Sequence, residues 1–164
     1  MLPLLLLLFA PADHFPTMEE WIHDWEVQRD FTIAVAQKMP AELYDFKATP
    51  EEMAFGVMVV HIGASLGGNV QQISGTKAQI SIRQPKTKDE VLKVTREWFD
   101  YSIDQIRKLS SEQLAREHEV NWEGRKTTTG RQMLLNMFAH TAHHRGQLEV
   151  YLRLKEIAPP FYTF

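Results

Sequence analysis

The spacing of apolar residues along the chain predicts an almost entirely helical protein. Apolar positions recur at every third or fourth residue over four long segments, about 18–39, 50–73, 88–109 and 130–155. This period lines one face of an α-helix, whereas the two-residue alternation of a half-buried strand is nearly absent. We therefore expect an all-α protein in which four helices bury their apolar faces as a four-helix bundle. The order of the helices around the bundle stays open.

Capping sequences support three of the four helix starts. The segments 49–52 (Thr-Pro-Glu-Glu) and 87–90 (Thr-Lys-Asp-Glu) each place a threonine before the helix and a glutamate three residues later, as in a capping box. Thr129 offers a third N-cap. We expect a loop at 74–86 and a longer polar connection at 110–128, where a short hairpin or 3₁₀ turn is compatible with the sequence but not required.

The N-terminal residues form a separate apolar segment. Residues 1–12 hold a leucine-rich run that is far too short to span a bilayer, and the run is followed by Ala-Pro-Ala, the small-x-small pattern of a signal-peptide cleavage site. However, no lysine or arginine precedes the run. Two alternatives stay open: a cleaved signal peptide of an exported protein, or an apolar extension that packs onto the domain of a cytoplasmic protein. In both cases we expect a single domain at 16–164 and no stable membrane insertion.

Composition excludes several classes of function. The 164 residues carry a formal net charge of −3, with lysine and arginine scattered among acidic residues, so electrostatic binding of nucleic acid is not expected. The absence of cysteine removes disulfides, thiolate metal ligands and a cysteine nucleophile.

The fourth predicted helix carries several histidines. His140 and His144 are one helical turn apart, and at about 100° per residue both point toward the apolar side of the helix. This spacing places two metal ligands on one helical face, as in zinc enzymes. His61, in the apolar second helix, is the best candidate for a third ligand. Pairing His140 with His143 is sterically feasible, but His143 lies on the flank of the helix.

Burial decides what these histidines can do. A buried imidazole is costly unless it has a partner, and one divalent metal ion satisfies several neutral imidazoles at once. Three imidazoles would leave a coordination position open, where water would have its pKa lowered to about 7 or a thiolate could bind. The alternatives are core histidines that are satisfied by hydrogen bonds, or a surface patch. Imidazole suits zinc, nickel and iron alike, so the ion stays undetermined.

Neighbouring residues carry further expectations. Gln147 lies one turn beyond His144 and is a candidate contact for a ligand ring or a substrate, or else a packing residue. Arg145 is expected to pair with Glu149, to lie at a dimer contact or to bind an anionic substrate. Gly146 predicts close packing, since glycine weakens a helix by up to about 1 kcal/mol. Three glycines of the second predicted helix also predict close packing: Gly63, Gly67 and Gly68. The remaining histidines are expected at the surface: His14, His23 and His118.

Several motifs resemble one known family. They are Asp-Phe-Lys-Ala-Thr-Pro at 45–50, Phe-Gly at 55–56 before Val-His-Ile at 60–62, and Phe-Ala-His-x₃-His-Arg-Gly-Gln at 138–147. From about residue 18 to 161 the chain resembles the DinB family of four-helix metalloproteins, also called the DinB/YfiT-like fold. The resemblance implies a homodimer in which zinc, nickel or iron is bound. Some relatives resemble thiol S-transferases that use low-molecular-weight bacterial thiols, and others hydrolases. The implied metal ligands are His61, His140 and His144.

These observations lead to two competing hypotheses. The first is a metal-dependent enzyme with a three-histidine site, which acts on a small-molecule substrate as a hydrolase or a thiol S-transferase. The second is a metal-binding or purely structural helical module without catalysis. The first hypothesis requires the imidazoles of His61, His140 and His144 to converge on a common point inside the bundle.

Overall fold

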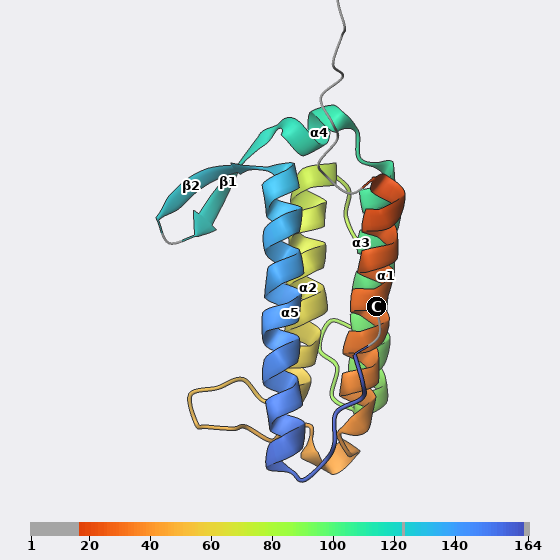
Figure 1. Ribbon diagram of the computed structural model, residues 1–164, viewed down its shortest axis with the longest axis vertical. Helices are drawn as coiled ribbons and strands as arrows, with labels where there is room; N and C mark the ends of the chain where they lie inside the picture. Colours follow the sequence, from red (N-terminus) through yellow and green to blue (C-terminus); the bar gives the residue numbers. More distant parts are fainter. Residues whose placement is uncertain (1–16, 123, 163–164) are drawn as a thin grey trace, which may run out of the picture.

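Four long helices run side by side along the length of the molecule (Figure 1). The structure is a computed structural model that describes residues 17–122 and 124–162, so the predicted leader segment 1–12 and His14 lie outside the described residues. The predicted all-α four-helix bundle is confirmed, with one short hairpin added to it. The bundle helices are α1 (Met18–Lys38), α2 (Phe55–Ser74), α3 (Lys88–Lys108) and α5 (Gly130–Leu154).

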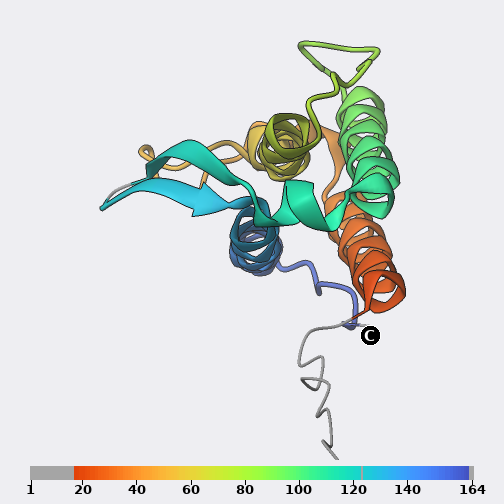
Figure 2. The ribbon, with the colours of Figure 1, turned by 90° about the horizontal axis from the view of Figure 1, so that it is seen from above.

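The order of the helices places α2 beside α5. In the view from above, α1 contacts α3 and α5, and α2 contacts the same two helices (Figure 2). The loop after α2 runs back along α3, since the Thr76 hydroxyl lies 2.8 Å from the Tyr101 hydroxyl and the Ser81 hydroxyl donates to Glu97 at 2.7 Å. Because this loop crosses the bundle lengthwise, α2 and α3 point the same way. The two helices that carry the candidate ligands, α2 and α5, are therefore neighbours.

Side-chain caps determine where α1, α3 and α5 begin. Thr17 and Thr87 form capping boxes at the starts of α1 and α3. The Thr129 hydroxyl accepts a hydrogen bond from the backbone N–H of Gln132 at 3.3 Å at the start of α5. The predicted N-caps at Thr87 and Thr129 are thus confirmed.

The start of α2 differs from the prediction. Residues 49–52 form a turn, and α2 begins only at Phe55, behind an N-cap without a side-chain hydrogen bond. The backbone N–H of Phe55 donates to the carbonyl of Phe46 at 2.9 Å, and that of Gly56 donates to the carbonyl of Tyr44 at 2.8 Å. These contacts satisfy the first N–H groups of α2, so the preceding segment, which includes the 3₁₀ helix η1 (Ala41–Leu43), sets the helix start.

The polar connection after α3 contains a short hairpin, one of the two structures with which its sequence is compatible. It consists of α4 (Ser111–Ala115), β1 (Glu117–Trp122) and β2 (Arg125–Thr129). His118 lies opposite Thr128 in the hairpin and is only 7% exposed, so its predicted surface position is wrong. Strand alternation turns His118 inward while Glu117 and Glu119 stay exposed. Burial lowers the pKa of the His118 imidazole. His23 is exposed, as expected.

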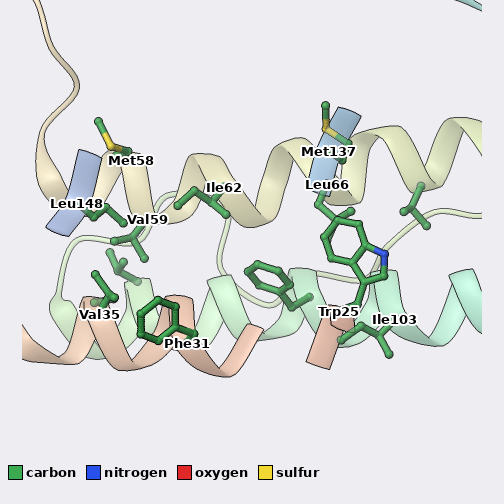
Figure 3. Packing of buried hydrophobic residues seen from close by; sticks show 14 of the residues in the cluster. Trp25, Phe31, Val35, Met58, Val59, Ile62, Leu66, Ile103, Met137 and Leu148 are labelled. Carbon is green, nitrogen blue, oxygen red and sulfur yellow. The ribbon is translucent and has the colours of Figure 1, made fainter. Parts of the chain in front are cut away.

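The core fills the space between the helices and reaches closest to the backbone of α2. Figure 3 shows Trp25 and Phe31 from α1 near Leu66 and Val59 from α2. A Cβ atom on Gly63 would lie 3.1 Å from the Cβ of Trp98, and one on Gly67 would overlap the Trp98 indole. Among the described residues, no helix combines the length and apolar character that crossing a bilayer requires.

The glycines of α2 therefore divide into two kinds. The predicted close approach is confirmed at Gly63 and Gly67, where the approaching group is the side chain of Trp98. At Gly68, nothing in the described part of the chain would lie within 4 Å of an added Cβ, so close packing there is not observed.

Candidate metal site

The three predicted ligands meet between α2 and α5. The Nε2 atoms of His61 and His140 are 3.2 Å apart. One ring nitrogen from each of His61, His140 and His144 lies within 4.8 Å of the other two. His143 is exposed on the flank of α5, as expected. The structure therefore brings the three rings together and leaves the fourth at the surface.

Core residues fix the direction in which these rings point. On α5, Met133 and Leu148 are completely buried on either side of the histidine pair. On α2, Ile62 follows His61 directly and is also completely buried. Because these side chains anchor the rotation of both helices, the imidazoles meet between α2 and α5, half-buried. The i, i+4 spacing then brings the ring centroids of His140 and His144 to 4.4 Å.

The environment of the cluster opposes protonation. Burial lowers the pKa of His140 to about 4, with further contributions from His144, His61 and His143. Burial also lowers the pKa of His61, and the neighbouring His144 adds to this effect. Both rings are therefore neutral at neutral pH, which is the form of imidazole that binds metal ions.

Gln147 orients one of the three rings. Its side-chain oxygen Oε1 lies 2.6 Å from Nδ1 of His144, one helical turn earlier on α5. A carbonyl oxygen can only accept, so Nδ1 of His144 donates this hydrogen bond and, in the neutral ring, Nε2 is the nitrogen with the lone pair. The contacts of the other two rings differ: Ser65 Oγ lies at a longer distance of 3.4 Å from Nδ1 of His61, and Nδ1 of His140 has no hydrogen-bond partner among the described residues.

The donor set fits a divalent metal ion. In a tetrahedral zinc site with nitrogen ligands at 2.0–2.1 Å, two ligand nitrogens lie about 3.3 Å apart. The separation of 3.2 Å between the Nε2 atoms of His61 and His140 is close to this value. A hydrogen bond between these two rings would use a single proton and would not account for the third ring, that of His144. The cluster contains no carboxylate.

Comparison with known proteins identifies the family. The sequence profile of the DinB superfamily matches residues 24–148, which include most of α1 and all three clustered histidines. The chain belongs to the DinB superfamily. It is 28% identical over 137 residues to the uncharacterized protein YjoA of Bacillus subtilis strain 168. The aligned region covers 82% of this chain and 88% of YjoA.

Solved structures of DinB-like proteins support the same fold. The crystal structure of Bacillus subtilis YjoA is similar with a TM-score of 0.71 and 25% identity, covering 88% of this chain and 98% of that protein. A DinB-like protein from Bacillus cereus ATCC 10987 has the same TM-score of 0.71 at 17% identity, with coverage of 88% and 97%. At that identity the likeness concerns the fold alone.

A cavity adjoins the histidine cluster on the α2 side. It has a volume of about 300 Å³ and includes His61 among the residues that line it. Val57 and Val60 from α2 contribute apolar surface, whereas Asp45 and Lys86 contribute opposite charges. This volume is at the lower end of the range for small-molecule sites, about 300–1,000 Å³.

Arg145 turns away from the cluster and toward α1. Its side chain is only 5% exposed, and its Nη1 donates to Oε1 of Gln28. The guanidinium carbon lies 4.7 Å from the ring centroid of Phe31 and 5.6 Å from that of Tyr162. Burial lowers the pKa of Arg145, although the group stays charged. The guanidinium thus bonds to Gln28, and the predicted ion pair with Glu149 is not formed.

The neighbouring Gly146 also differs from its prediction. Among the described residues, nothing would lie within 4 Å of a Cβ atom at this position. The expected close packing is therefore wrong for the single chain, because Gly146 lies on the solvent side of α5, where the residue is exposed.

Proposed function

We propose that His61, His140 and His144 bind one divalent metal ion and that the protein is a metal-dependent enzyme, a hydrolase or a thiol S-transferase. The observation that carries this proposal is the convergence of three imidazoles from two helices, with two of the nitrogens 3.2 Å apart. Membership of the DinB superfamily is consistent with it. Zinc, nickel and iron all suit this donor set.

The residues around the site have different roles in this proposal. When bound, such an ion supplies Lewis-acid chemistry and an open coordination position. His61 and His140 offer neutral nitrogens at neutral pH because burial lowers their pKa values. Oε1 of Gln147 accepts a hydrogen bond from the Nδ1–H group of His144 and so leaves Nε2 of that ring to bind the ion.

The cavity beside His61 is the proposed substrate cavity. Val57 and Val60 give one wall an apolar surface, while Lys86 and Asp45 offer contacts of opposite charge. A volume of about 300 Å³ favours a small molecule over a macromolecular substrate. Hydrolysis and thiol transfer both benefit from a partly dry cavity next to the ion.

Elemental analysis of the purified protein tests the metal site. We expect one ion per chain in the wild-type protein and in His143→Ala, the matched control on the flank of α5. Separate replacement of His61, His140 and His144 by alanine should each lower the metal content well below one ion. Retention of one ion per chain by all three variants would refute the ligand set.

Activity assays then separate an enzyme from a binding module. Metal-loaded and metal-free protein should be compared on activated esters, on amides, and on a thiol together with an electrophile. We expect turnover in one class that requires the ion and is lost in His140→Ala. A loaded protein that is inert in every class would favour the alternative, a non-catalytic metal-binding module.

We further propose that the protein acts as a homodimer. The solvent side of α5 supports this proposal, because Val150 and Leu154 are 54% and 55% exposed there. Exposed apolar side chains of this kind are common at protein interfaces when they form a patch. Sedimentation equilibrium should give twice the chain mass for the wild-type protein and a lower mass for Val150→Glu. A wild-type monomer would contradict the proposal.

A further inference from the structure

A small apolar cleft opens between α1 and α5 and shares no residue with the histidine cluster. It has a volume of about 150 Å³, and six residues line it: Trp21, Asp24 and Trp25 from α1, and Leu134, Leu135 and Phe138 from α5. The histidines of α5 face α2, whereas this cleft lies on the side of α5 that faces α1. It is therefore separate from the proposed metal site.

The partly exposed rings of Trp21 and Phe138 and the buried ring of Trp25 surround the cleft. Trp21 and Trp25 are one helical turn apart on α1, so their indoles lie on the same face of the helix. Phe138 packs edge-to-face against Trp25, with centroids 5.2 Å apart and ring planes at 78°. Trp25 is held rigidly, since only 1% of it is exposed, while Trp21 and Phe138 are partly exposed. The cleft is thus a preformed aromatic corner that small groups can reach from solvent.

A carboxylate completes this corner. Asp24 lies between the two tryptophans in the sequence, lines the same cleft and is exposed. Within residues 17–122 and 124–162, Asp24 forms no hydrogen bond or ion pair, whereas Asp30 on the same helix pairs with Arg29 and Arg96. The charge of Asp24 is therefore available to a ligand in the cleft.

We propose that this cleft binds a small organic cation through a quaternary ammonium group. Aromatic faces attract cations through their quadrupole, and several rings around one carboxylate suit a charge that is spread over methyl groups. An anion would be repelled by Asp24. The volume accommodates one ammonium head group, since larger drug-sized ligands need about 300 Å³ or more. The cleft shares no residue with the proposed metal site, so the cation-binding proposal can be tested independently of the proposed enzyme activity.

A pair of probes of equal shape tests the charge. Choline and 3,3-dimethylbutan-1-ol differ at the head group, where the alcohol has a neutral carbon in place of the ammonium nitrogen. Both should be titrated into the metal-free full chain, with tryptophan fluorescence and calorimetry as readouts. We expect choline to bind at least about threefold more tightly, as cation–π contacts require. Equal affinities, or no detectable binding of choline, would overturn the proposal.

Two charge variants locate the site. Asp24→Asn should weaken choline binding about two- to fivefold, the range for an exposed ion pair, and leave the alcohol unaffected. Glu19→Gln removes the same charge from an exposed position on α1 outside the cleft and should leave choline binding unchanged. Equal effects of the two variants would show general charge attraction and contradict the assignment. Trp21→Leu, which keeps an apolar side chain, should lower choline affinity more than Asp24→Asn does.

Discussion

Helix α5 buries ionisable side chains on two faces in opposite ways. Toward α2, burial holds His140 in its neutral form, with a pKa of about 4, beside His61 and His144. Toward α1, Arg145 keeps its charge and is surrounded by partners, with Gln28 as hydrogen-bond acceptor and Phe31 under the guanidinium. His144 and Arg145 are neighbours in the sequence and lie on these two faces. The free-energy cost of burial is lowered by loss of charge on the α2 face, and by contacts with partner side chains on the α1 face.

The difference follows from the chemistry of the two side chains. Imidazolium loses a proton at moderate cost and the neutral ring then offers a lone pair, so a buried histidine cluster is ready to bind an external cation. Guanidinium does not lose its proton in proteins, so it requires acceptors and aromatic faces supplied by the fold. The histidines on the α2 face are thus suited to binding a metal ion, and Arg145 on the α1 face to holding α5 against α1.

The largest expected effect concerns the α1 face. Arg145→Met removes the donor to Oε1 of Gln28, which is 2% exposed, so the free energy of unfolding should fall by about 2 kcal/mol. The double variant Arg145→Met with Gln28→Leu should recover most of this loss, because the orphaned acceptor is removed as well. Urea denaturation measures both. An unchanged stability in the single variant would contradict the structural role of Arg145.

The next effect concerns the α2 face. Gln147→Leu leaves Nδ1 of His144 without its acceptor, so metal affinity should fall about tenfold or more. Competition with a chromophoric chelator measures the affinity. Gln132→Leu is the matched control, because Gln132 lies on the same helix but bonds to Asn136. If both variants bind metal as tightly as the wild type, Gln147 does not orient the ring.

A smaller effect concerns the pH dependence of the metal-free protein. The pKa of His140 is about 4 in the folded protein and near 6.5 in the unfolded chain, so between these values the unfolded chain binds more protons. Stability should therefore be highest above pH 6.5 and fall as the pH drops toward 4. His140→Leu should flatten this part of the profile in thermal denaturation. An equally steep decline in this variant would assign the effect to other groups.

The smallest effect concerns the solvent side of α5, between the two buried faces. Gly146→Ala adds a Cβ where nothing in the described chain lies within 4 Å, so stability should rise by up to about 1 kcal/mol. Chemical denaturation at low protein concentration measures the gain. A loss of stability would mean that another surface packs against Gly146, and the same measurement at high concentration would then reveal a partner copy.

The sequence predicts those features of the molecule that depend on local order. Apolar periodicity locates the four helices, and the threonine at position 87 correctly marks the start of α3. The i, i+4 spacing correctly places His140 and His144 on an inward face. The equivalent cap at Thr49 fails, because hydrogen bonds from Phe55 and Gly56 to the preceding segment set the start of α2.

The remaining features depend on contacts between distant parts of the chain. Gln28 and Arg145 are 117 positions apart, so no local pattern predicts their hydrogen bond. The sequence around His118 gives a weak indication of its burial, since the exposed residues Glu117 and Glu119 flank it in β1. A single short strand gives too little periodicity to predict which residues are buried. The aromatic corner likewise requires α1 and α5 to be neighbours, which the long connections leave open.

The position of a bound ion tests the central claim most directly. Crystals of the zinc-loaded protein should be measured at the zinc absorption edge, so that anomalous scattering locates the ion. We predict one peak between α2 and α5, within bonding distance of a ring nitrogen from each of His61, His140 and His144. A peak at any other group of residues, with these three rings bound to no ion, would contradict the account.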